Sequence, residues 1–350
     1  GGLRAVANDA IFFLPLELKL DHSMKIAIIG GGNMGGAIAK GIAAGSLVPA
    51  SDLTVTAHTQ QTLDKIKGYD PAIRTRLDNR EAVQGADLVV LAVKPWLLEE
   101  VVKEIRGGLD YRKQAVASVI GRSSFEELGK LLDNGSGVMP VMYRIIPNTA
   151  ISLGESVTFI AEQGAPKERL DELVSIFSEL GQTVVVKEPM MGPGTSLASC
   201  GIAFALKYLD ASIQGGVELG FAPEEARAVV MQTMRGALEM MNLNGTMPQT
   251  EIDKVTTPGG MTLRGLAAME ESGFTEAVKT FQQQINHGIQ IQTGRRQSRE
   301  QRPRASGRFA RCYADVGIGR PGSRTAPGGS RGDSGFVGGG GIRPQRDAVA

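Results

Sequence analysis

Cysteine, histidine and aromatic residues are scarce in this sequence. Its 350 residues include two Cys, three His and one Trp, and 5% of them are aromatic. Cys200 and Cys312 lie far apart and outside any CxxC spacing, so neither a disulfide framework nor a cysteine-based metal site is expected. We therefore expect no bound metal and a location in a reducing cytoplasm.

Long hydrophobic runs are also lacking. The apolar run at residues 11–14 is short and is followed by Pro15 and Glu17, so it makes a poor secretory signal. No stretch reaches the roughly 20 apolar residues that a membrane-spanning helix requires. We expect no membrane partner.

Charge is unevenly distributed along the chain. Residues 294–350 contain 12 Arg, no Lys and four acidic residues, so the net charge of +1 leaves about −7 for the rest. A negatively charged body argues against nucleic acid as a partner. The tail, with 13 Gly, has too little apolar surface to offset its ordering entropy. We expect residues 294–350 to be disordered or artefactual, with a basic RNA-tethering tail as the alternative.

Between the two ends, the sequence pattern changes once, from alternating strands and helices to helices alone. Residues 1–23 have no clear period, and we expect a non-native or disordered leader before Met24. Residues 24–187 alternate short β-rich runs with helical patterns, which predicts a Rossmann-type α/β domain with a doubly wound, mostly parallel sheet covered by helices on both faces. Residues 188–293 read as helices. Strands are expected at residues 25–29, 53–57, 88–93, 115–120, 138–145, 156–160 and 183–187.

A glycine-rich turn links the first expected strand to a helical pattern. Gly30, Gly32 and Gly35 fit G-x-G-x-x-G in this strand–turn–helix context. Gly30 permits a tight turn, Gly32 lets the backbone approach a pyrophosphate, and Gly35 lets the helix pack on the strand. Asn33 and Met34 lie between the last two of these glycines, and the helical pattern follows from Gly36. The N-terminal amides of that helix can bind phosphate. We expect a dinucleotide site, with a ligand-free turn as the alternative.

The end of the second expected strand bears on the choice of cofactor. NAD-selective sites place Asp or Glu there to hold the ribose 2′-hydroxyl. Here the chain continues as Ala57-His58-Thr59, with neither a carboxylate nor an Arg. His58 and Thr59 could hydrogen-bond a 2′-phosphate, so we expect NADP, with NADPH preferred and NADH possible. A plain surface role is the alternative for His58.

Two further strand ends supply candidate site residues. Val93, Lys94 and Pro95 end a buried run, and ligands of doubly wound sheets bind beyond the carboxyl ends of strands. They are expected beside the cofactor, with a solvated side chain as the alternative for Lys94. Asn148 follows a later strand, where its carboxamide could orient the nicotinamide or the substrate.

The helical half contains two unusual stretches. Residues 196–219 are apolar or small on nearly every face, which requires burial that a small domain can hardly supply, so we expect a homodimer or larger homo-oligomer. Residues 257–260, Thr-Pro-Gly-Gly, break one helix before another apolar pattern begins, which places Thr262 at or near an N-cap. Two glycines before a helix expose amides suited to a carboxylate. The alternative is a simple connection between helices.

These segments together resemble the pyrroline-5-carboxylate reductase family. Residues 30–35, 92–95, 146–149, 232–233 and 257–262 occur in the family's order, and the resemblance spans roughly residues 24–277. It implies a Rossmann domain followed by a helical domain that interlocks with a second subunit. It also implies that the substrate carboxylate binds at Thr257, Gly259, Gly260 and Thr262, with Thr262 near the imine nitrogen.

The implied activity is reduction of 1-pyrroline-5-carboxylate to L-proline with NAD(P)H, the last step of proline biosynthesis. Reducing an iminium requires no nucleophile, metal or strong base, because the cationic carbon accepts hydride and positioning supplies most of the rate. The sequence departs from the family pattern at 199–204, where Ser-Gly-Pro-Ala-Tyr is usual, at Trp96, where Gln is common, and at Met261, where a smaller residue is common. These departures bear on the shape of the pocket.

Two other functions remain open from the sequence. A 3-hydroxyacid dehydrogenase of similar architecture needs an acid/base group, for which Lys207 is the candidate, but it leaves the loop at 257–262 unexplained. A non-catalytic NADP-binding oligomer is the other alternative.

Overall fold

The structure, a computed structural model, describes residues 4–7, 10–13, 23–121 and 123–299. The expected tail lies outside these residues from position 300 onward, and so does Cys312. Among the described residues, no helix has both the length and the apolar character needed to span a membrane.

Six parallel strands form one side of a ten-stranded sheet and reach its edge at β5 (Arg74–Arg76). Numbered along the chain, their spatial order is 3-2-1-4-5-6, which is the order of a doubly wound nucleotide-binding sheet. The predicted fold class is therefore confirmed. In spatial order the strands are β5 (Arg74–Arg76), β4 (Leu53–Thr56), β3 (Ile26–Ile29), β6 (Leu88–Leu91), β7 (Ala115–Ser118) and β8 (Met142–Ile146).

Four further strands extend the sheet beyond β8. β9 (Ser156–Gln163) runs antiparallel to β8, and β10 (Gly181–Val185) runs parallel to β9. β2 (Ala10–Phe13) pairs antiparallel with β10 and with β1 (Arg4–Ala7). Within residues 1–23, for which a non-native or disordered leader is predicted, these two segments form strands, and a non-native origin of the leader stays a prediction. The pairing gives the backbone groups at the outer edge of β10 hydrogen-bonding partners.

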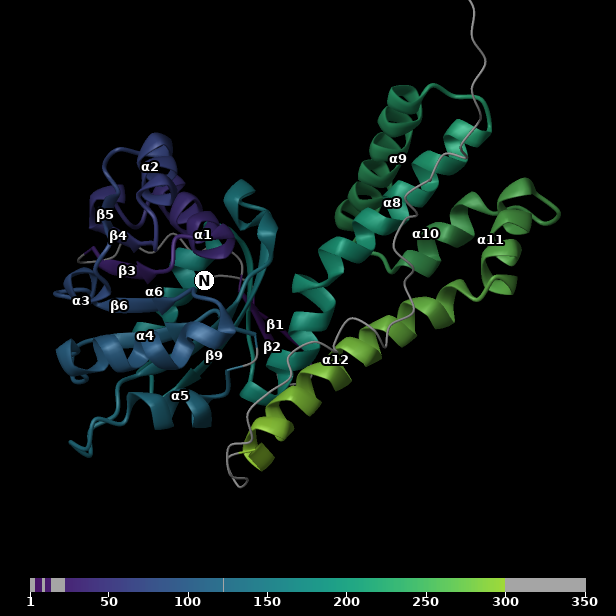
Figure 1. Ribbon diagram of the computed structural model, residues 1–350. Coiled ribbons are helices and arrows are strands. Elements are labelled where there is room, and N and C mark those ends of the chain that lie inside the picture. The colour runs from purple at the N-terminus through teal and green to yellow at the C-terminus, as the bar shows by residue number, and fades with distance from the viewer. Residues whose placement is uncertain (1–3, 8–9, 14–22, 122, 300–350) are drawn as a thin grey trace, which may run out of the picture. The chain divides into compact units, whose positions relative to one another are not determined.

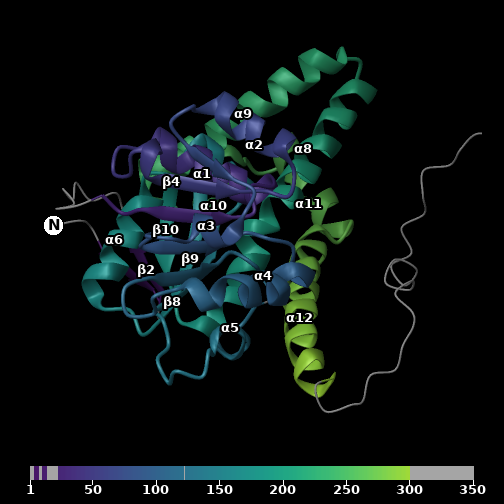
Figure 2. The same cartoon turned by 60° about the vertical axis from the view of Figure 1, so that its left-hand side comes forward.

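Helices cover both faces of this sheet. α1 (Asn33–Ala44), α2 (Gln60–Tyr69) and α6 (Lys167–Ser178) contribute to an apolar cluster on one face. α3 (Asn79–Ala82), α4 (Leu98–Ile105) and α5 (Phe125–Leu132) contribute to the cluster on the other. α1 and α2 are seen on one side of the sheet and α4 and α5 on the opposite side (Figure 1, Figure 2). The two-faced covering agrees with the prediction.

Several strand boundaries differ from expectation by two to four residues, and one strand within residues 24–187 was missed. β8 begins at Met142 rather than at residue 138, because Pro140 lacks an amide donor and Gly135 and Gly137 adopt positive φ. β5 was not predicted. It has only three residues, two of them exposed Arg, and so carries no hydrophobic pattern.

The chain after residue 187 is helical, as predicted. A short turn at Glu188–Met190 leads into α7 (Met191–Gly194) and a single π-helical turn at Thr195–Ser199. The remaining helices are α8 (Gly201–Glu218), α9 (Pro223–Asn244), α10 (Pro248–Val255), α11 (Met261–Glu271) and α12 (Phe274–Arg299). α12 continues past the expected end at residue 293.

A partly buried ion pair joins the sheet to the start of the helical half. Arg144 of β8 donates from Nη1 to Oε1 of Glu188 at 3.0 Å and from Nη2 to the carbonyl of Gly121 at 3.1 Å. The same Oε1 accepts from the amide of Phe125 at 2.7 Å. Burial lowers the pKa of the Arg144 guanidinium, and the Glu188 carboxylate opposes that change. This pair ties β8, α5 and the helical half together.

Arg144→Met tests this junction. Removing the Arg144 guanidinium leaves the Glu188 carboxylate, which is one-third exposed and keeps its hydrogen bond from Phe125, so we expect a loss of about 1–2 kcal/mol in the free energy of unfolding. Denaturant unfolding of Arg144→Met and of the control Arg112→Met, an exposed arginine, measures the difference. Equal stability of the two variants would show that the pair contributes nothing.

Candidate functional site

The direction of strand order reverses between β3 and β6, and this reversal creates a crevice at their carboxyl ends. The chain leaves β3 into α1 on one face of the sheet and leaves β6 into Pro95–Leu97 and α4 on the other. Ligands of open α/β sheets bind at such a point. The predicted residues at 30–35 and 93–95 therefore meet in one place.

Close backbone contacts explain the first and last glycines of the turn. Gly30 has φ +106°, and a Cβ there would lie 2.8 Å from the carbonyl oxygen of Ala92. A Cβ on Gly35 would overlap the carbonyl oxygen of Gly30 and approach the Cβ of Ala92 to 3.0 Å. These contacts match the geometric roles that the sequence predicts for Gly30 and Gly35.

Gly32 differs from its neighbours because its α-carbon faces open space. A Cβ there would have nothing within 4 Å, and Gly32 is the N-cap of α1, without a side-chain cap. Gly32 and Asn33 are exposed, and Met34 is partly buried. The first amides of a helix have no intrahelical partner, so this end of α1 offers donors to a phosphate. The arrangement fits a dinucleotide pyrophosphate.

Two residues that position the turn were missed in the sequence. Thr56, the last residue of β4, accepts from the amide of Gly30 through Oγ1 at 3.2 Å and from the amide of Gly31 through its carbonyl at 2.5 Å. A Cβ on Gly31 would lie 2.7 Å from Cδ1 of Ile66 in α2. A buried threonine at a strand end was the available signal for Thr56.

Polar side chains beyond β4 and β6 border the crevice. His58 and Thr59 are exposed, and Thr59 caps α2 by accepting from the amide of Thr62 at 3.4 Å. Lys94 is exposed as well, while Pro95 starts a short 3₁₀ turn. Val93 lies beside Gly30, where its Cγ1 would be 3.0 Å from a Cβ.

Asn148 is buried and already makes local hydrogen bonds. Its Oδ1 accepts from the amide of Ala150 at 3.0 Å, and its own amide donates to Oγ of Ser156 at 3.3 Å. The carboxamide thus caps a 3₁₀ turn, Thr149–Leu153. Because Oδ1 is used in this cap, Nδ2 of Asn148 is the side-chain atom that would orient a ligand in the predicted role.

The loop predicted to bind the substrate carboxylate, residues 257–262 (the substrate loop), connects α10 to the first turn of α11. Gly259 adopts φ +73°, and the amide of Gly260 donates to the carbonyl of Thr257 at 2.9 Å. Gly260 is the N-cap of α11 and Thr262 is its second residue, close to the predicted N-cap position. Thr257, Gly259 and Thr262 are exposed. In the described chain no hydrogen bond or ion pair joins this loop to the crevice.

The departures from the family pattern fall at surface-accessible positions. Trp96 is 73% exposed and Met261 is 88% exposed. Cys200 is partly buried at the end of the π-helical turn, and burial raises the pKa of its thiol. The thiol therefore stays protonated at neutral pH, which disfavours thiolate chemistry. Among the described residues, no three His, Cys, Asp or Glu side chains are placed to share a metal ion.

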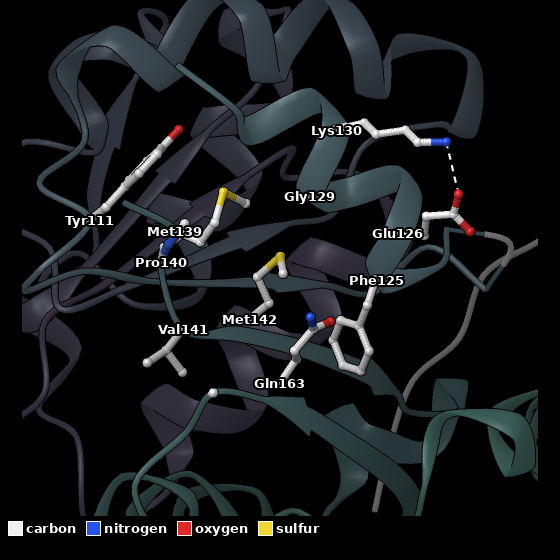
Figure 3. A pocket seen from close by; sticks show the side chains of 11 residues that line it. Tyr111, Phe125, Glu126, Gly129, Lys130, Met139, Pro140, Val141, Met142 and Gln163 are labelled. Atoms are coloured by element: carbon white, nitrogen blue, oxygen red, sulfur yellow. Dashed lines mark hydrogen bonds and ion pairs between the residues drawn. The ribbon is translucent and has the colours of Figure 1, made fainter. Parts of the chain in front are cut away.

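A cavity of about 390 Å³ lies elsewhere, beside the amino end of β8 (Figure 3). Its walls include Phe125 of α5 and Met142 of β8, and the Lys130–Glu126 ion pair, at 2.8 Å, lies at its side. None of the predicted site residues lines it. We place the functional site at the crevice because the amide donors are there.

Two family models match the two halves of the chain. Residues 25–120 match the model described as coenzyme F420-dependent NADP oxidoreductase. Residues 188–288 match the model of pyrroline-5-carboxylate reductase dimerisation.

Curated relatives carry the same enzyme name. Pyrroline-5-carboxylate reductase of Synechocystis is 31% identical over 258 residues, which cover 73% of this chain and 93% of that protein. Pyrroline-5-carboxylate reductase 1 of Dictyostelium discoideum is 32% identical over 265 residues, covering 72% of this chain but 47% of that longer protein.

Solved structures of these reductases share the fold. The Coxiella burnetii enzyme superimposes with a TM-score of 0.69 at 26% identity, covering 77% of this chain and 98% of that one. The Plasmodium falciparum enzyme, solved with NADP bound, gives a TM-score of 0.70 at 22% identity with the same coverage.

Two glycine variants distinguish a structural role in the glycine turn from a role in binding the cofactor. Gly35→Ala inserts a methyl group where α1 touches β3, so we expect it to lower stability by a few kcal/mol and abolish NADPH binding. Gly32→Ala meets no atom of the chain, so it should fold normally and lose affinity for NADPH by about tenfold or more. Thermal unfolding and NADPH titration measure both. Unchanged affinity in Gly32→Ala would argue against pyrophosphate contact there.

Proposed function

The chain belongs to the pyrroline-5-carboxylate reductase family, and we propose that it transfers hydride from NADPH to the imine of 1-pyrroline-5-carboxylate, giving L-proline. The observation that carries this proposal is the pairing, in one chain, of a dinucleotide crevice with a Thr-Pro-Gly-Gly loop at the start of α11. We further propose a cytoplasmic location, on the scarcity of cysteine.

The crevice would hold NADPH through backbone donors. The first turn of α1 offers amides beside the open α-carbon of Gly32, which suits a pyrophosphate. The chain following β4 carries His58 and Thr59 in place of a carboxylate, so no negative charge there would repel a 2′-phosphate. Val93, Lys94 and Pro95 would border the cofactor from the β6 side. These features support NADPH over NADH.

The substrate loop would hold the carboxylate. Gly260 is the N-cap of an 11-residue helix and has no side-chain cap, so the amides of Met261 and Thr262 are oriented towards an anion. Thr257 and Thr262 add neutral hydroxyls. A carboxylate bound at this position would turn the ring imine towards Thr262.

In this mechanism the chain contributes position and hydrogen bonding. NADPH, when bound, supplies the hydride. The loop at 257–262 would fix the substrate carboxylate, and the Thr262 hydroxyl would hydrogen-bond the ring nitrogen. Alignment of two reactants in a closed site can account for most of such a rate. Lys207, the acid/base candidate of the dehydrogenase alternative, instead forms an exposed ion pair with Asp210 at 2.9 Å.

A homodimer is the smallest assembly that we propose. In the described chain no residue of α8 or α11 is buried, and α9 buries only Ala226. Large apolar side chains are exposed along these helices: Leu206, Leu219, Val229, Leu238, Leu243 and Leu263. Such a surface requires a partner, and a second copy of the helical half supplies a matching one.

Assembly through these helices is tested at Leu238. Leu238→Arg places a charge in the apolar surface, so we expect the solution mass measured by light scattering to fall to that of a monomer. Glu239→Arg, at the next position, is the control and should keep the assembled mass. A Leu238→Arg protein that stays assembled would place the interface elsewhere.

The activity is tested by following NADPH oxidation with 1-pyrroline-5-carboxylate and, separately, NADP reduction with 3-hydroxy acids. We expect turnover of the imine alone. Failure of pure, assembled protein to reduce the imine would overturn the proposed function.

Thr262→Val examines the loop's role in that reaction. Losing one hydrogen bond to the reacting nitrogen should lower kcat/KM by about tenfold, while NADPH affinity is retained. Thr250→Val, an exposed threonine in the first turn of α10, is the matched control. Loss of NADPH binding in Thr262→Val would mean that the loop has a structural role.

A further inference from the structure

An arginine that the sequence pattern did not reveal lies beside the end of β4. β5 pairs in parallel with β4 in the register Thr54↔Arg74 and Thr56↔Arg76. Thr56 is also the residue that accepts the amides of Gly30 and Gly31. The backbone of Arg76 therefore neighbours the residue that anchors the glycine turn, at the carboxyl edge of the sheet.

The side chain of Arg76 is available to an anion. Aligned residues of neighbouring strands project from the same face, so Arg76 shares its face with Thr56. Nε of Arg76 lies 3.7 Å from Oε2 of Glu81. The Arg76 side chain is 50% exposed and the Glu81 side chain is 68% exposed. Nη1 donates to the carbonyl of its neighbour Thr75 at 3.0 Å. An ion pair this long and this exposed contributes little, so a stronger anion can replace it.

The cofactor brings such an anion to this edge. The ribose next to the adenine binds where the second strand of a doubly wound sheet ends, which here is the end of β4. In NADPH that ribose carries a 2′-phosphate. A guanidinium is suited to phosphate because its planar N–H groups can bind two oxygens at once.

We propose that Arg76 binds the 2′-phosphate of NADPH and thereby sets the preference for NADPH over NADH. This proposal rests on the proposed function as an NADPH-dependent enzyme. Arg76 reaches the phosphate from the neighbouring strand, beside His58 and Thr59 at the end of β4. Glu81 holds the guanidinium near this edge before the cofactor binds.

Arg74 provides a matched control. It lies on the same strand and the same face, is likewise exposed, and is aligned with Thr54, two residues farther from the carboxyl edge. A general loss of positive charge affects Arg74→Ala and Arg76→Ala alike, whereas a phosphate contact is specific to Arg76.

The experiment titrates NADPH and NADH into the full, assembled protein and follows the nicotinamide fluorescence. For Arg76→Ala we expect Kd for NADPH to rise about tenfold to a hundredfold, the loss of one charge-assisted contact, and Kd for NADH to change less than twofold. Arg74→Ala should leave both values within twofold. Adenosine 2′,5′-bisphosphate should displace NADPH less effectively from Arg76→Ala than from Arg74→Ala. AMP, which lacks the 2′-phosphate, should bind both variants equally well.

Two results would overturn the proposal. Equal loss of NADPH and NADH affinity in Arg76→Ala would assign the residue to the structure of the turn, and no loss of NADPH affinity would remove it from the site. Binding is measured without the imine, so failure of imine reduction is a separate result.

Discussion

The close approach of α1 to β3 is the constraint on which the site depends. A side chain at Gly35 would overlap the carbonyl of Gly30, and one at Gly30 would press on Ala92 of the β6 end. Because both positions lack a Cβ, the helix begins directly above the sheet and directs its free amides into the crevice. The same close packing that completes the core therefore brings the uncapped start of α1 to the carboxyl ends of the strands. Thr56 adds a second support by accepting two amides of the turn.

The two halves of the chain differ in how their apolar side chains are buried. The sheet half buries an apolar cluster on each face under its own helices. The helical half leaves large apolar side chains exposed in the described chain, so it depends on a partner for burial. The proposed interface and the proposed substrate loop, residues 257–262, lie on the same group of helices, so a partner that covers these helices would also cover α11.

Sequence patterns were sufficient wherever a feature was local. The glycine turn, the buried strands and the helix start at 257–262 each follow from short spacings with a physical meaning. Long-range register was not accessible in this way. The three residues of β5, Arg-Thr-Arg, contain no pattern of apolar residues, so the sequence did not predict this strand. The position of Arg76 beside Thr56 follows from the pairing of β5 with β4, which only the structure shows. Asn148 was placed correctly at a strand end, but its use in capping a turn depends on burial that no local pattern encodes.

A reaction governed by alignment fits the few side chains that could serve as a catalytic acid or base. Burial raises the pKa of the Cys200 thiol, and Lys207 forms an exposed ion pair with Asp210. Apart from His58, the groups that would contact ligands are backbone amides, threonine hydroxyls, the Asn148 carboxamide and charged side chains of arginine and lysine. These groups keep one protonation state near neutral pH, so the protein's contribution lies in their geometry. We therefore expect contacts that maintain that geometry, such as the Arg144–Glu188 pair between β8 and the helical half, to influence catalysis without touching a ligand.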